Sequence, residues 1–150
     1  MPPGKLTIIV GPPGAGKSTL ARTLHRSITG LCIEDFHANA NHNSPEVKDS
    51  RHYRALIEAL RAGHDCIVAD IEFCKRQRRQ DLERTIRQDV PSVCMEWRHF
   101  EKNYKKCENN ILHRNSTHWE RDLERLKDLY DEYIIPCGVV PIEIWQHDTR

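Results

Sequence analysis

Apolar and polar residues follow two spacings along this chain. Short apolar runs of strand length lie at 6–10, 31–34, 65–70, 92–97 and 139–145. Between them, apolar residues recur every three or four positions at about 17–27, 44–63, 75–88, 100–113 and from 117 to just before Pro136. Strands that alternate with amphipathic helices are typical of a parallel sheet covered on both faces. We therefore predict an α/β fold with a five-stranded, mostly parallel sheet flanked by helices.

Local signals set several element boundaries. Gly30 and Gly63 each end a predicted helix, because glycine leaves helical geometry easily. A capping-box pattern, Thr117-x-x-Glu120, opens the last helix. The polar stretch 36–43, FHANANHN, follows neither spacing, so we predict a loop there.

A glycine-rich octapeptide lies between the first predicted strand and the first predicted helix. Its sequence, GPPGAGKS at 11–18, matches in full the phosphate-binding pattern G-x-x-x-x-G-K-[ST]. The glycines let successive amide N–H groups turn toward a phosphate, Lys17 reaches the β- and γ-phosphates, and the Ser18 hydroxyl is placed to bind Mg²⁺. The motif and its context predict a P-loop NTPase fold with ATP and Mg²⁺ as ligands. We expect the nucleotide to be held by Gly11, Pro12, Pro13, Gly14, Ala15, Gly16, Lys17, Ser18 and Thr19.

Composition and charge narrow the range of possible binding partners and cellular locations. A chain of 150 residues fits a single domain, 1–150. The 23 basic and 22 acidic residues nearly cancel, so no overall field draws the protein to nucleic acid or to a membrane. The six cysteines form no C-x-x-C pair and predict reduced, buried thiols. We find neither a signal peptide nor an apolar stretch of membrane-spanning length. We expect a cytoplasmic protein without a membrane partner.

Acidic residues follow two of the predicted strands. In open α/β sheets the ligand lies at the carboxyl ends of the strands, so these residues are candidates for catalysis. The run CIVAD ends in Asp70, which either supports Mg²⁺ as a Walker B carboxylate or only caps the next helix. Glu34 and Asp35 end the second strand, where a carboxylate can accept the proton of an attacking hydroxyl. The alternative for Asp35 is a purely structural role in the turn.

Arg114 lies in a polar segment between the last two predicted helices. We expect residues of about 100–118 to form a helical lid, from which this guanidinium closes over the transferring phosphoryl group. The alternative is a cation that only stabilises a helix C-terminus. The basic run from Lys75 to Arg87 is either a track for a phosphate backbone or a solvated face. Three tryptophans occupy apolar positions and are predicted to be core residues rather than base-stacking ones: Trp97, Trp119 and Trp145.

Several of these features together resemble the polynucleotide-kinase and zeta-toxin group of P-loop kinases. They are the phosphate-binding pattern, the acidic strand end EDFH at 34–37, the strand that ends in Asp70, and the terminal Tyr133-x-x-Pro136. The second-strand motif of that group resembles Asp-Asp-aromatic-Arg, with the base at its first acid. The resemblance therefore implies that Glu34 is the base, with Asp35 behind it, and that His37 stands where the group has a substrate-binding arginine.

The lid segment departs from that group. It reads CENNILHR at 107–114, and Asn109 or Asn110 stands where the group carries the first of two arginines. Arg114 is then left as the second arginine.

We predict a Mg²⁺-dependent kinase that transfers the γ-phosphoryl group of ATP to a hydroxyl, with a small molecule favoured over a nucleic-acid 5′ end as acceptor. The alternative is a nucleotide-binding switch or an NTP hydrolase that acts on water. A regulatory GTPase would need the guanine-binding motif N-K-x-D, which this sequence lacks. The expected catalytic residues are Lys17, Glu34, Asp35 and Arg114, and the expected metal-binding residues are Ser18 and Asp70.

Overall fold

The centre of the structure is a parallel sheet. The computed structural model describes residues 2–37, 47–114 and 117–146. The sheet has four strands in the order β2-β3-β1-β4, and Leu6 of the first lies opposite Cys66 and Met95 of its two neighbours. Because all four strands are parallel, their carboxyl ends meet at one edge of the sheet. The strands are β1 (Lys5–Val10), β2 (Cys32–Ile33), β3 (Cys66–Ala69) and β4 (Cys94–His99).

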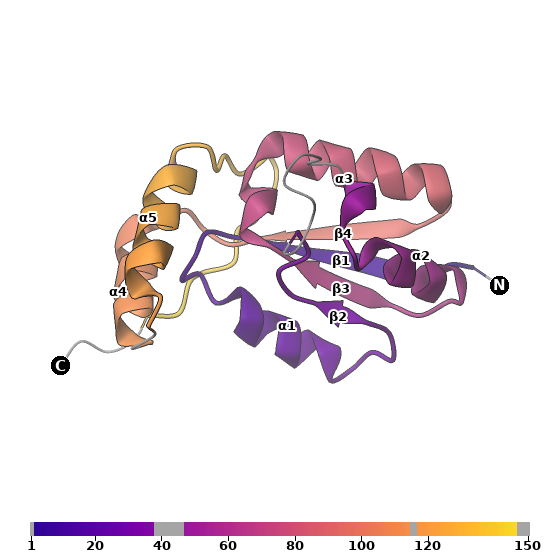
Figure 1. The fold of residues 1–150 in the computed structure, drawn as a ribbon, viewed down its shortest axis with the longest axis horizontal. Coiled ribbons are helices and arrows are strands. Elements are labelled where there is room, and N and C mark those ends of the chain that lie inside the picture. The colour runs from indigo at the N-terminus through magenta and orange to yellow at the C-terminus, as the bar shows by residue number, and fades with distance from the viewer. Residues whose placement is uncertain (1, 38–46, 115–116, 147–150) are drawn as a thin grey trace.

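Helices cover both faces of this sheet. Helix α1 (Lys17–His25) lies on one face, and α2 (Tyr53–Arg61) and α3 (Arg76–Asp89) lie on the other (Figure 1). Helices α4 (Tyr104–His113) and α5 (Trp119–Tyr130) pack together as a pair beyond the carboxyl edge. Two short 3₁₀ helices complete the described elements, η1 (Val47–Asp49) and η2 (Ile71–Cys74).

Strand β1 separates two apolar cores, because its side chains alternate between the two faces of the sheet. Ile8 packs in the cluster that contains Leu56 of α2. Ile9 packs in the other cluster, with Ala21 of α1 and Ile111 of α4. The apolar side chains of this strand are fully buried, so the loop that follows it begins from a well-packed base.

A row of rings runs from the end of β2 to the segment after α5. Neighbouring ring centroids in this aromatic ladder are 6.2, 6.4, 6.4 and 6.1 Å apart. The hydroxyl of Tyr133, its last member, donates a hydrogen bond to the Phe100 carbonyl over 2.5 Å. This bond fixes the segment after α5 against the end of β4. The members of the aromatic ladder are Phe36, Phe73, Trp97, His99 and Tyr133.

The prediction of a fifth strand at 139–145 is wrong. Within this segment Ile142 alone pairs with the sheet, through one parallel bridge to Phe100. The Ile142 N–H donates to the His99 carbonyl and the Ile142 carbonyl accepts from the Glu101 N–H, each over 2.8 Å. Pairing with the sheet is limited to this single bridge, so the segment does not form a strand.

Several helix boundaries also differ from the prediction, and α5 ends at Tyr130 rather than just before Pro136. The helix expected over 44–63 begins only at Tyr53, and its first expected residues lie outside the described ones. Helix α4 begins at Tyr104 because β4 continues to His99. The capping box is wrong: α5 has His118 at its N-cap, and no side-chain hydrogen bond caps it there.

Two of the three tryptophans are not core residues. Trp97 packs against the core, but Trp119 is 41% exposed and Trp145 is 70% exposed. All six cysteines are free thiols, but the prediction that they are buried is wrong for Cys94 and Cys137, which are exposed, and for the half-buried Cys32. Among the described residues there is no helix with the length and apolar character needed to cross a membrane.

Candidate active site

The phosphate loop, residues 11–18, joins the buried end of β1 to the first turn of α1. Gly14 and Gly16 have φ angles of +85° and +105°, which favour glycine over any other residue. Gly16 is the N-cap of α1 and makes no side-chain cap, so the first N–H groups of the helix stay available to an anion. The backbone of the phosphate loop therefore has the shape that the sequence pattern predicts.

Lys17 is folded back onto this loop. Its Nζ donates a hydrogen bond to the Pro12 carbonyl over 2.9 Å. Burial lowers the pKa of Lys17, and the nearby charge of Arg114 acts in the same direction, whereas Asp70 acts against it. The structure thus brings three of the predicted site residues into one electrostatic neighbourhood.

Asp70 lies at the end of β3, and it is 5% exposed. One carboxylate oxygen accepts from the Glu72 N–H over 2.8 Å, which makes Asp70 the N-cap of η2. The other accepts from the His37 N–H over 2.6 Å and lies 3.2 Å from the His37 Nδ1. Burial by itself would raise the pKa of Asp70, but these contacts with His37 and Glu72 outweigh it, so the pKa falls below its ordinary value. Asp70 is therefore an ionised cap, and its role toward a metal stays a prediction.

The end of β2 presents the two candidate bases to solvent. Glu34 and Asp35 are both exposed, and Asp35 has a φ of +53°, in the left-handed region that aspartate tolerates better than most residues. The next residue, Phe36, turns back into the core. The geometry leaves both carboxylates at the carboxyl edge and does not choose between them.

His37 does not face solvent at the position that the resemblance gives to a substrate-binding arginine. Its side chain is 8% exposed and contacts the rings of Phe36 and Phe73. Its Nδ1 faces Asp70, so the ring links the end of β2 to the end of β3. His37 is a connecting residue between these two strand ends.

Arg114 is the C-cap of α4. Its guanidinium lies 3.4 Å from the Asp122 carboxylate of α5, and 47% of the side chain is exposed. An ion pair with this much exposure contributes little to stability.

Helix α4 packs directly against the phosphate loop, which sequence reasoning missed. A Cβ added at Gly14 would lie 2.4 Å from the Cys107 carbonyl oxygen. The Asn110 side-chain nitrogen donates to the Gly14 carbonyl over 3.0 Å and to the Trp145 carbonyl over 2.7 Å. No local pattern signals these contacts, because they join residues 96 and 35 positions apart.

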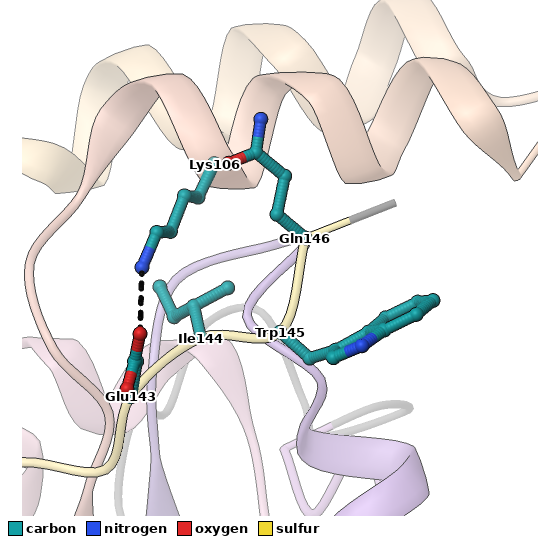
Figure 2. A pocket seen from close by; sticks show the side chains of 5 residues that line it. All are labelled: Lys106, Glu143, Ile144, Trp145 and Gln146. Atoms are coloured by element: carbon teal, nitrogen blue, oxygen red, sulfur yellow. Dashed lines mark ion pairs between the residues drawn. The ribbon is translucent and has the colours of Figure 1, made fainter. Parts of the chain in front are cut away.

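A pocket of about 430 Å³ lies between α4 and the C-terminal segment. Figure 2 shows the Lys106 side chain reaching from its helix toward Glu143, and the Trp145 ring directed away from both. The Lys106 Nζ is 3.5 Å from Glu143 and 2.9 Å from Glu101. The lining residues are Lys106, Glu143, Ile144, Trp145 and Gln146.

The donors present fit Mg²⁺ that arrives with a nucleotide. Among the described residues, no group of three or more histidine, cysteine, aspartate or glutamate side chains could hold a metal by itself. In phosphate-transfer sites Mg²⁺ needs only one or two protein oxygens, because phosphate and water supply the rest. The exposed Ser18 in the first turn of α1 and the ionised Asp70 are donors of that kind.

The sheet order, the phosphate loop and its flanking helices define a member of the P-loop kinase superfamily. A family model described as an AAA domain matches residues 6–133, and the chain belongs to this family.

Solved structures share the fold. Nine solved chains match, among them a gluconokinase from Sinorhizobium meliloti 1021, with a TM-score of 0.64 over 97% of this chain and 85% of that one. The two sequences are 16% identical, so this likeness shows the fold alone. No curated protein matches the sequence.

Proposed function

We propose that this protein is a Mg²⁺-dependent kinase that transfers the γ-phosphoryl group of ATP to the hydroxyl of a small molecule. The observation that carries the proposal is the neighbourhood of Lys17: a phosphate loop with its helix N-terminus open, a buried anionic Asp70 and a cationic Arg114. Phosphoryl transfer needs positioning and charge neutralisation more than covalent chemistry, and this arrangement supplies both.

Each residue has a defined task in this proposal. Lys17 leaves the Pro12 carbonyl and binds the β- and γ-phosphates, while Arg114 leaves Asp122 and neutralises charge on the γ-phosphoryl group as it transfers. The acceptor oxygen forms the new bond to phosphorus, the bond from the γ-phosphorus to the bridging oxygen breaks, and ADP leaves. The acceptor proton passes to Glu34 or Asp35.

Ser18 and Asp70 are the residues that would hold Mg²⁺. When bound with ATP, the ion would neutralise charge on the β- and γ-phosphate oxygens.

We infer that the base of the nucleotide lies against Trp145. An exposed indole offers a flat apolar face for stacking, and this one borders the pocket beside α4. Its main-chain carbonyl shares the Asn110 amide with the phosphate loop, so the pocket and the phosphate site are close neighbours.

The contacts of the basic run in α3 favour a small acceptor over a polynucleotide. Arg79 turns inward and donates to the carbonyls of Phe73 and Cys74 over 2.8 and 3.0 Å. Other members pair with acids of the same region, and these pairs are Lys75 and Arg78 with Glu72, Arg84 with Asp81, and Arg87 with Glu83. The gluconokinase of the same fold is, by its name, also a kinase of a small molecule.

An acceptor screen with γ-labelled ATP and Mg²⁺ tests the proposal. We expect label on a small polyol, sugar acid or nucleoside and little on a 5′-hydroxyl oligonucleotide. If the oligonucleotide is labelled instead, its apparent affinity should fall with salt, with a log–log slope of roughly −0.7 for each phosphate contacted. Release of inorganic phosphate that no acceptor diverts would support the rival function, a hydrolase or switch that acts on water.

A further inference from the structure

Asn110 lies on the side of α4 that faces the phosphate loop, and it is 8% exposed. Its single amide nitrogen donates to two main-chain carbonyls, Gly14 over 3.0 Å and Trp145 over 2.7 Å. An NH₂ group has two hydrogens, so these two bonds use its whole donor capacity. One buried side chain therefore joins the phosphate loop to the wall of the neighbouring pocket.

The peptide group between Gly14 and Ala15 is held at both ends. Its carbonyl oxygen accepts from Asn110, and its N–H donates to the Pro12 carbonyl over 3.2 Å. Because a peptide group is planar and its C=O and N–H point in opposite directions, fixing both ends fixes the orientation of the whole group. The same Pro12 carbonyl accepts from Lys17, so the turn and the lysine share one anchor.

We propose that Asn110 is a positioning residue that presets the phosphate loop for the triphosphate of a nucleotide. A loop already in its binding shape loses less conformational entropy when the ligand arrives, and this appears as higher affinity. The close packing of α4 on Gly14 supplies the surface, and the carboxamide supplies the orientation. The inference rests on the proposed function only in taking a nucleotide polyphosphate as the ligand.

The test is nucleotide binding by isothermal titration calorimetry on the full chain. Asn110→Asp keeps the size of the side chain but removes both donors, and Asn110→Ala removes them without burying a charge. We expect each variant to bind ADP and inorganic tripolyphosphate at least about tenfold more weakly than the wild type, as the loss of a buried hydrogen bond implies. In turnover, KM for ATP should rise in the same proportion, while kcat and the acceptor KM change by less than about twofold.

Asn103→Asp is the matched control. Asn103 is the N-cap of the same helix, and its side-chain oxygen accepts from the Lys106 N–H over 3.1 Å. Aspartate accepts equally well there, so the same substitution should leave both affinities unchanged.

Three results overturn the proposal. In the first, Asn110→Ala binds fewer molecules per chain but with the wild-type Kd, because the residue then only supports folding. In the second, ADP binding weakens while tripolyphosphate binding does not, because Asn110 then acts through the Trp145 segment and not through the phosphate loop. In the third, the wild type binds neither probe, and the kinase proposal fails with it. A wild type that binds both probes but phosphorylates no acceptor overturns the kinase proposal alone.

Discussion

The phosphate side and the acceptor side of the candidate active site are built in different ways. On the phosphate side, the backbone of residues 11–18 leaves a buried strand, adopts two glycine-specific turns and packs against α4. On the acceptor side, the exposed Glu34 and Asp35 follow a strand of two residues. In the proposed kinase, a tightly packed backbone and Lys17 would therefore bind phosphate, whereas the acceptor would meet exposed side chains.

Removing the lysine of the phosphate loop is the strongest test of this comparison. Lys17→Ala should lower ATP turnover by about 10⁴-fold, because the phosphates lose the side-chain cation that neutralises their charge. Steady-state kinetics measure this loss. Lys5→Ala is the control, since Lys5 lies at the opposite end of β1 in an exposed pair with Glu96. Wild-type turnover in Lys17→Ala would remove the phosphate loop from the mechanism.

The acceptor side is tested by comparing its two acids. If Glu34 is the base, Glu34→Gln should lower kcat at least about 10²-fold and Asp35→Asn much less, and the reverse order would assign the base to Asp35. ADP affinity should stay constant in both variants, because neither carboxylate belongs to the phosphate loop. Unchanged kcat in both would show that no acid at the end of β2 takes the proton.

The packing of α4 on the phosphate loop is tested by two glycines with nearly the same φ. Gly138→Ala, at φ +82° with open space around it, should cost about 1 kcal/mol of unfolding free energy. Gly14→Ala, at φ +85°, adds the clash with the Cys107 carbonyl and should cost about 3 kcal/mol. Urea denaturation measures both. Equal costs would mean that α4 moves away easily and does not support the loop.

Substituting Asp70 has a smaller expected effect, and the result separates a metal-binding role from a purely capping role. An asparagine side chain can cap η2 through its one oxygen, but its NH₂ group cannot accept from the His37 N–H, so Asp70→Asn should lower the melting temperature. The lost charge should raise the Mg²⁺ concentration needed for half-maximal turnover by about 10- to 100-fold. A lower melting temperature with unchanged Mg²⁺ dependence per folded molecule would leave Asp70 as a cap alone.

The sequence predicted those parts of the structure that depend on residues close together in the chain. The run before Gly11, the glycines of the phosphate loop and the start of α1 at Lys17 follow from residues that are neighbours in the chain. The segment 139–145 misled the prediction because its apolar residues resemble a strand, although only Ile142 pairs with the sheet.

The remaining site contacts are long-range. Asn109 or Asn110 was expected at the position of a missing arginine, but the Asn110 side chain donates to two carbonyls far away in the sequence. His37 looked like a residue for substrate, but it pairs with Asp70 across two strands. Such partners appear only when the fold is known.

The aromatic ladder makes the stability of the folded protein depend on pH. His99 lies within it, 2% exposed, and burial lowers its pKa to about 4, with the Arg79 charge acting in the same direction. In the unfolded chain its pKa is about 6.5, so between these values the unfolded state binds the proton and the folded state does not. Stability should therefore fall as the pH drops from about 6.5 to about 4, by up to about 3 kcal/mol. Urea melts at several pH values should show this slope, and His99→Gln should flatten it. Acidification would thus weaken the fold at the aromatic ladder.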